Sequence, residues 1–173
     1  MLNKALVDTL SQIGEIVDLV RELPNDVRSG VYIDNEVGLH VRHVMDHLQA
    51  FLTGLATGEV DYNVRRRRSL CETDPAIASE QLNSLIKKLT ELRTPKVDLF
   101  VVSEIDCFST RSERFQSNAG REMLYLINHT IHHAAYIRLL LRGSGLALPA
   151  HIGVAPCTAT FHRGAHAPLQ GAH

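Results

Sequence analysis

NAGREMLYLINHTIHHAAYIRLLLR, residues 118–142, is the most informative segment of the chain. No proline interrupts it and Gly143 follows it, so it predicts one long helix with Ser117 or Asn118 as the N-cap. Because successive residues turn by about 100°, one face collects a carboxylate, two histidines and three apolar side chains. These residues are Glu122, Leu126, His129, His133, Ile137 and Leu140. Further apolar residues occupy the other faces, which predicts a largely buried helix.

His129 and His133 are spaced i and i+4, so they stack on one face and could share a ligand. His132 is rotated by about 100° from His133 and should point elsewhere. Buried imidazoles need partners for both ring nitrogens. An HxxxH pair alone is also explained by core packing, and Thr130 stands where the HExxH motif of metalloproteases has its glutamate.

A second group of histidines, His40, His43 and His47, lies in GLHVRHVMDH, within a predicted helix over about 36–57 that Gly58 ends. One imidazole from this helix would join the pair on the long helix. Three neutral nitrogens with an open fourth position are typical of catalytic zinc sites. Since imidazole suits Zn, Ni, Fe and Cu alike, the ligand type does not name the metal.

The rest of the chain predicts a mainly α-helical fold, all-α apart from one hairpin. Apolar residues at three- and four-residue steps predict helices over about 2–23 and 75–93, with a loop over about 25–35 and Asn35 as the next N-cap. The β-branched and aromatic run that begins at Val97 predicts a small β-hairpin. We expect a four-helix bundle with this hairpin between its third and fourth helices and an irregular C-terminal tail.

Composition limits the functions to consider. A chain of 173 residues with 45% hydrophobic residues is expected to form one globular domain. A net charge of −1 argues against nucleic acid or a membrane surface as partner, and the run Arg65 to Arg68 is only a local basic segment. With no long apolar segment and no CxxC among the three cysteines, we expect a cytoplasmic protein.

Four segments together resemble the DinB-like family of metal-binding four-helix bundles, which is related to bacillithiol- and mycothiol-dependent transferases. They are VGLHVRHVMDH, VDYNVRRR, REMLYLINHTIHHAAYI and GVAPCT, and the resemblance covers about residues 36–158. It implies a DinB-like domain over 1–158, followed by an irregular histidine-containing tail over 159–173.

The resemblance implies three metal ligands, His43 from the second helix and His129 and His133 from the fourth. His43 follows Gly38 by five residues, in the surroundings usual for the family. The helical wheel is less decisive, and His47, nearer the edge of the apolar stripe, is the alternative to His43.

The resemblance also implies a metal-dependent transferase or hydrolase that activates a thiol or water for a small-molecule substrate. A divalent ion of Zn, Ni or Fe is the expected cofactor, with a low-molecular-weight thiol as a second one to test. Glu122, on the histidine face, is the candidate catalytic carboxylate, although the helix dipole equally explains a carboxylate near a helix N-terminus. Tyr62 with Arg65 or Arg67 could border the pocket and bind an anionic substrate, and a surface role is the alternative for these residues.

Two features of the chain outside the site complete these expectations. Cys157 stands where similar sequences have serine, and either a reactive thiol or a small buried side chain would explain it. We also expect a homodimer, since bundles of this kind often pair through an apolar helix face.

Two alternatives stay open from the sequence. In the first, the ion only fastens helices in a non-catalytic, stress-associated binding or scaffold protein, which a fourth protein ligand would favour. In the second, no metal binds and the histidines form a polar network in the core.

Overall fold

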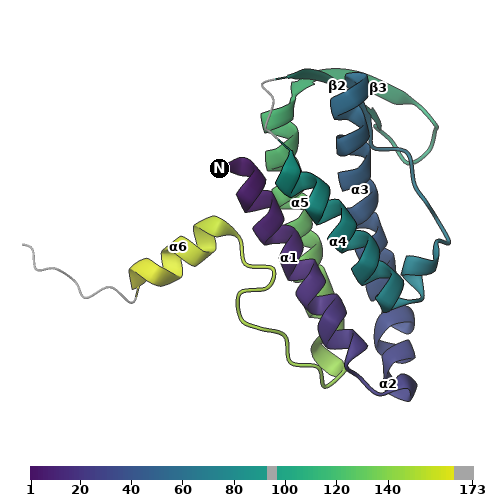
Figure 1. The fold of residues 1–173 in the computed structure, drawn as a ribbon, viewed down its shortest axis with the longest axis vertical. Helices are drawn as coiled ribbons and strands as arrows, with labels where there is room; N and C mark the ends of the chain where they lie inside the picture. Colours follow the sequence, from purple (N-terminus) through teal and green to yellow (C-terminus); the bar gives the residue numbers. More distant parts are fainter. Residues whose placement is uncertain (93–96, 166–173) are drawn as a thin grey trace, which may run out of the picture.

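The computed structural model describes residues 1–92 and 97–165, and within these ranges the chain is mainly helical with one small sheet (Figure 1). The helices are α1 (Leu2–Arg21), α2 (Asn25–Ser29), α3 (Val37–Thr57), α4 (Pro75–Glu91), α5 (Ala119–Leu140) and α6 (Pro156–Ala165). The strands are β1 (Glu59–Asp61), β2 (Asp98–Glu104) and β3 (Ser112–Asn118). The mainly α-helical class predicted from the sequence is confirmed. Across the described ranges, no helix combines the length and the apolar character that crossing a membrane requires.

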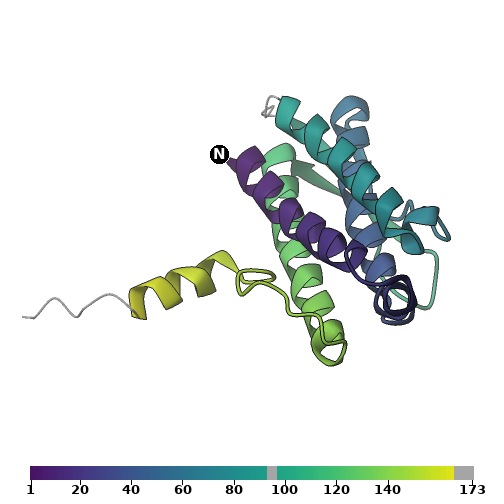
Figure 2. The same cartoon turned by 60° about the horizontal axis from the view of Figure 1, so that its bottom comes forward.

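The four long helices α1, α3, α4 and α5 pack around one apolar core. α1 lies against α4 and α5, and α3 also lies against α4 and α5 (Figures 1 and 2). The stripe predicted for α1 lies on the face that this helix buries, namely Leu6, Thr9, Leu10, Ile13, Ile16, Val17 and Val20. Because α3 and α5 are neighbours, the two helices that carry the histidine groups lie side by side.

Local capping explains where these helices begin and end. The Asn118 side chain accepts a hydrogen bond of 3.0 Å from the backbone N–H of Arg121, which confirms the predicted N-cap of α5. The Asp74 carboxylate caps α4 in the same way, accepting from the backbone N–H of Ala76 at 2.8 Å. Gly58 ends α3 at φ +84, a left-handed conformation that glycine adopts without steric cost.

The predicted hairpin is formed by β2 and β3, which pair antiparallel with Leu99 opposite Ser117. A strand that the sequence did not indicate, β1, pairs parallel to β2 with Val60 opposite Val101. The sheet order is therefore β1-β2-β3. Since β1 follows α3 after Gly58 and β3 runs directly into α5, the sheet joins the two histidine-bearing helices at one end.

The prediction of a loop over 25–35 is wrong, because α2 and a π-helical segment, Gly30–Asp34, occupy most of this range. Burial explains the compact form: Tyr32 is 1% exposed, and its hydroxyl donates a hydrogen bond of 2.8 Å to the Cys71 carbonyl. Asn35 is not the N-cap of α3 either. That position belongs to Glu36, which adopts the left-handed conformation at φ 59.

The expectation of an irregular C-terminal tail is wrong in part. α6 begins at Pro156, a residue that favours the first turn of a helix, and it projects from the rest of the molecule (Figure 2). Cys157 lies on this helix and is exposed, so it is not a small buried side chain. The rest of the predicted tail, residues 166–173, and the predicted end of the third helix at Arg93 lie outside the described residues.

The expectation that α5 is buried on nearly all sides also needs correction. Leu124 and Leu139 are about half exposed, at 51% and 50%, whereas Glu122 and Ile137 are fully buried. Apolar side chains therefore do not indicate burial uniformly around this helix, since its covered faces are those turned toward α1 and α3.

Candidate metal centre

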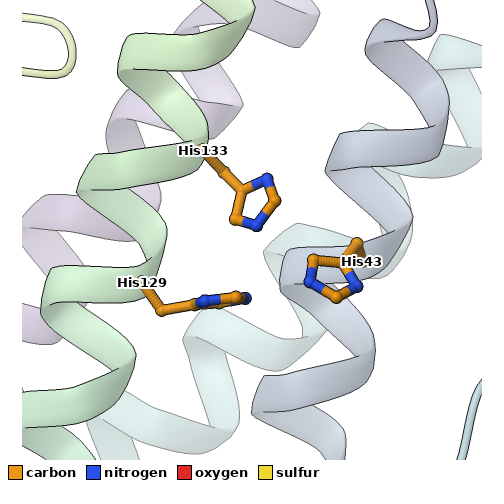
Figure 3. A group of neighbouring side chains, drawn as sticks. All are labelled: His43, His129 and His133. Carbon is orange, nitrogen blue, oxygen red and sulfur yellow. The ribbon is translucent and has the colours of Figure 1, made fainter. Parts of the chain in front are cut away.

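His43 from α3 and His129 and His133 from α5 converge between the two helices, as Figure 3 shows. One ring nitrogen from each lies within 4.8 Å of those of the other two. We call these three residues the histidine cluster. Nitrogens bound to one tetrahedral zinc ion at about 2.0–2.1 Å lie about 3.4 Å apart, so the cluster needs only a modest contraction to hold an ion.

Residues outside the cluster contact one ring nitrogen on each of two cluster histidines. The Nδ1 atom of His133 lies 3.0 Å from Nδ1 of His40, and the Arg65 guanidinium contacts Nδ1 of His43. The Nε2 atom of His133 takes no part in these contacts. On His43 the guanidinium can only donate, so Nδ1 accepts and the ring proton lies on Nε2, and an ion bound at His43 requires this contact to break. On the third ring, Nε2 of His129 is buried and has no hydrogen-bond partner among the described residues, and a metal ion would satisfy such an atom.

Burial keeps the cluster imidazoles uncharged. Burial and the charges nearby together lower the pKa of His43 and His133 to about 3 and that of His129 to about 4, and for His43 and His129 these charges include the Arg65 cation. The three imidazoles are therefore neutral near pH 7. Neutral imidazole is the form that offers a lone pair to a metal ion.

His47, the alternative to His43, lies beside the cluster. Its ring centroid is 4.3 Å from that of His129, and the ring stacks on Tyr62 at 4.9 Å. It is 5% exposed, burial lowers its pKa to about 2, and its Nε2 has no hydrogen-bond partner within residues 1–92 and 97–165. The structure thus groups His43 with the pair on α5 and leaves a fourth neutral imidazole next to them. That any of them holds an ion stays a prediction.

The remaining two histidines of α3 and α5 differ sharply from each other. His132 is exposed, in agreement with its rotation on the helix away from His133. His40 is half-buried and contacts His133 directly, which the sequence did not indicate. The only sequence signal for His40 was its place in a histidine-rich segment, because the contact depends on how α3 and α5 are rotated against each other.

Glu122, the candidate catalytic carboxylate, is fully buried but lies outside the cluster. Seven positions along α5 separate it from His129, which corresponds to about 10 Å along a helix. Its carboxylate accepts hydrogen bonds from the Tyr62 hydroxyl at 2.7 Å, from Arg121 at 2.9 Å and from the Ser117 hydroxyl. It sits in the first turn of α5, so the structure favours the helix-dipole explanation for its position.

Aromatic side chains lie between Glu122 and the cluster. Tyr125 stacks on His129 with ring centroids 5.4 Å apart, and Tyr62 lies 5.1 Å from Tyr125. Burial and the neighbouring carboxylate of Glu122 both raise the pKa of Tyr62, so its hydroxyl stays protonated and donates. Tyr62 is buried and belongs to the wall of the candidate site, not to the surface. That it binds an anionic substrate stays a prediction.

Two neighbouring hollows lead from the candidate site to solvent. One is lined by Arg121, Leu124, Tyr125, Asn128 and His129, so a cluster residue forms part of its wall. The other, of about 350 Å³, shares Arg121 and Tyr125 with the first and reaches Glu122. The first hollow therefore reaches one side of the His129 ring, while the Nε2 atom of His129 stays buried.

The basic segment divides into one residue at the candidate site and three at the surface. Arg65 is half-buried beside His43, whereas Arg66, Arg67 and Arg68 are exposed. The side chain and the backbone N–H of Arg66 both donate to Asp46, at 2.8 and 3.1 Å. This anchoring of Arg66 holds its neighbour next to the cluster, so Arg65, and not Arg67, is the cation beside the histidines.

Comparison with known proteins assigns the chain to no family. No protein-family model matches it, and no solved structure does. The chain is similar to FK506-binding protein 5 of Rhizopus delemar, with 30% identity over 135 residues, which make up 77% of this chain and 34% of that protein. The chain thus spans about a third of the length of this curated relative.

Proposed function

We propose that the chain is a DinB-like protein with a four-helix bundle, and that its histidine cluster binds one divalent metal ion in a transferase or hydrolase site. One observation carries most of the weight: a ring nitrogen from each of His43, His129 and His133 lies within 4.8 Å of the other two. Two separate helices supply these nitrogens, so a shared ligand gives a physical reason for their convergence.

The chemistry of the donors fits a metal ion. The three imidazoles are neutral, and the buried Nε2 atom of His129 has no partner among the described residues. The cluster contains no carboxylate or thiolate, so the donor set is nitrogen only and suits Zn, Ni or Fe. Three protein nitrogens leave room for a further ligand on a tetrahedral ion.

A bound divalent ion lowers the pKa of a thiol or of water and so supplies a nucleophile at neutral pH. The protein's own residues favour an anionic partner there. Arg65, half-buried against His43, places a positive charge beside the cluster, whereas Arg121, in the hollow that includes His129, is already paired with Glu122 at 2.9 Å. A low-molecular-weight thiol with a carboxylate group matches the Arg65 cation, so thiol transfer is the reaction to test first.

Glu122 has a supporting place in this function. It is too far along α5 to touch a group held by the cluster, but it accepts from Tyr62, and Tyr62 stacks on His47. Its carboxylate therefore fixes the aromatic wall of the site. We assign it no direct role in proton transfer.

One observation favours the alternative of a non-catalytic, metal-stabilised scaffold. The Nε2 atom of His47, unpartnered among the described residues, belongs to a ring that lies 4.3 Å from that of His129, so a small shift could add a fourth imidazole. Four protein ligands would close the coordination sphere, as in structural zinc sites. The two functions therefore differ in whether an outside ligand can reach the ion.

Cobalt substitution distinguishes these functions, because Co²⁺ reports its ligands through its visible and near-ultraviolet absorption. Metal-free full-length protein is loaded with Co²⁺ and titrated with β-mercaptoethanol. We expect a thiolate-to-cobalt absorption band in the wild type and in His132→Ala, which keeps the cluster intact, and no tightly bound Co²⁺ in His43→Ala. Arg65→Gln should still bind Co²⁺ but require more thiol to reach the same band.

Two results would count against the metal-dependent enzyme. Tight Co²⁺ binding with a spectrum that no thiol changes would favour the scaffold, and a wild type that does not bind Co²⁺ would favour a polar core network.

The name of the Rhizopus delemar relative refers to FK506, but the match spans about a third of that protein, so it adds nothing to the case from the histidines. A small-molecule substrate, a cytoplasmic location and a homodimer remain predictions.

A further inference from the structure

His40 contacts the histidine cluster from outside it. Its Nδ1 atom lies 3.0 Å from Nδ1 of His133, a normal hydrogen-bond length between nitrogens. The ring of Tyr136 meets the His40 ring edge-on, with centroids 4.8 Å apart and planes at 64°. His40 is half-buried, so this contact is partly protected from water.

We propose that His40 is a positioning residue for the metal site: it accepts a hydrogen bond from Nδ1–H of His133 and thereby fixes the tautomer that leaves the Nε2 lone pair of His133 for the ion. This inference rests on the proposed function, since it assigns the role of a neighbour of the same cluster. His40 itself is not a ligand.

Counting protons on the two rings decides which of them donates. A neutral imidazole carries one N–H, so a hydrogen bond between two Nδ1 atoms needs the proton on one ring and a lone pair on the other. If His40 donates, His133 keeps its proton on Nε2 and has no lone pair there for an ion. If His133 donates, its Nε2 lone pair is free, and His40 carries its own proton on Nε2.

Only the second arrangement is compatible with an ion bound through Nε2 of His133. A partner that accepts from the remote N–H of a metal ligand fixes the ligand's orientation and raises its basicity. The edge-on contact with the Tyr136 ring gives His40 a second contact beside the one with His133. Loss of His40 should therefore weaken metal binding without removing a ligand.

His132 provides a matched control for this role. It stands next to His133 in the sequence and is exposed, and its ring lies at 88° to that of His133 with centroids 5.8 Å apart. Its removal takes a nearby histidine from α5 without removing the bond between the two Nδ1 atoms.

A Zn²⁺ competition titration against a chromophoric chelator, with full-length protein, measures the contribution of His40. We expect His40→Ala to weaken Zn²⁺ binding roughly 10- to 100-fold and His132→Ala to leave it unchanged. His40→Asn should restore most of the affinity, because its amide oxygen lies near the position of Nδ1. His40→Gln should not, because its amide group lies further from the backbone.

Two further measurements separate positioning from a structural role. The midpoint of thermal unfolding of each metal-free variant shows whether that variant folds. If His40→Ala does not fold, His40→Asn still tests the role of His40. Long-range ¹H–¹⁵N correlation spectra of the Zn²⁺-loaded wild type should place the His133 proton on Nδ1, and a proton on Nε2 instead would overturn the inference.

The other outcomes of the titration are equally decisive. Unchanged affinity in His40→Ala, with binding lost in His43→Ala, would overturn the inference and leave the proposed function intact. Loss in His40→Ala as complete as in His43→Ala would make His40 a ligand and also overturn it. A wild type that binds no Zn²⁺ would remove the proposed function, and the inference with it.

Discussion

Replacing Asp46 by alanine should destabilise the protein strongly, because Asp46 balances charges that are buried in α3. Its carboxylate is 1% exposed and accepts from Arg42 at 2.7 Å, one helical turn earlier, where the Arg42 side chain is 8% exposed. It also accepts from the side chain and backbone of Arg66. Asp46→Ala therefore leaves a buried guanidinium without its main partner.

The size of the effect depends on what remains around Arg42. Removing one member of a buried ion pair costs about 3–5 kcal/mol, because the other charge stays buried and unpaired. Glu72 compensates in part: its carboxylate lies 2.6 Å from Arg42 Nε, although the N–H is not aligned for a hydrogen bond. We therefore expect the lower end of that range, about 3 kcal/mol of unfolding free energy.

Equilibrium urea unfolding of the metal-free protein measures this loss, with Asp8→Ala as the control. Asp8 forms the same i,i+4 pair on a helix with Lys4, at 2.6 Å, but both side chains are well exposed. Its removal should cost no more than about 0.5 kcal/mol. Both variants gain the same helix propensity from alanine, so the difference between them isolates burial. If Asp46→Ala lost no more than about 1 kcal/mol beyond the control, the buried charges would not depend on this carboxylate.

Three other predictions concern the core, the thiols and the pH. Gly38→Ala should lower the unfolding free energy by about 2–3 kcal/mol, because a Cβ there would collide with the Glu72 carbonyl, whereas Gly14→Ala, with only an ordinary contact, should be neutral or stabilising. Equal stability of the two variants in urea would contradict this. Iodoacetamide should label Cys107 and Cys157 in native protein but Cys71 only in urea, because Cys71 is buried and burial raises its pKa. Rapid labelling of Cys71 in native protein would show that it is not packed in the core. Metal-free protein should lose stability as the pH falls from about 6.5 toward about 3. In this range the histidines of the unfolded chain bind protons, whereas the buried histidine cluster of the folded protein stays neutral. Urea midpoints that stay constant over this range would contradict the prediction.

Local patterns in the sequence determine part of this fold and were readable from it. The apolar stripe of α1 and the cap at Asn118 depend only on spacing and on one side chain. The π-helical segment Gly30–Asp34 was not readable from the sequence. Its compact form depends on the burial of Tyr32 and on the hydrogen bond from Tyr32 to Cys71, which lies far along the chain. The strand β1 needs β2, also far along the chain, as its partner, so its three residues carry no pattern of their own.

The same distinction applies to the candidate site. The pairing of His129 with His133 follows from helix geometry. The resemblance selected His43 over its neighbours, and His43 lies in the cluster, while its role as a ligand stays a prediction. The contact of His40 with His133 and that of Arg65 with His43 depend on how α3, α5 and the basic loop pack, which no local pattern records. The spacing of seven residues already placed Glu122 about 10 Å along the helix from His129, whereas its hydrogen bond from Tyr62 depends on how the basic loop packs against α5.

Metal stoichiometry, obtained by elemental analysis after equilibrium dialysis of full-length protein against Zn²⁺, asks whether the histidine cluster is a metal site at all. If it is, the wild type and His132→Ala hold one equivalent more than His43→Ala, His129→Ala or His133→Ala. Equal metal content in all of these proteins would mean that the imidazoles that meet between α3 and α5 are not ligands.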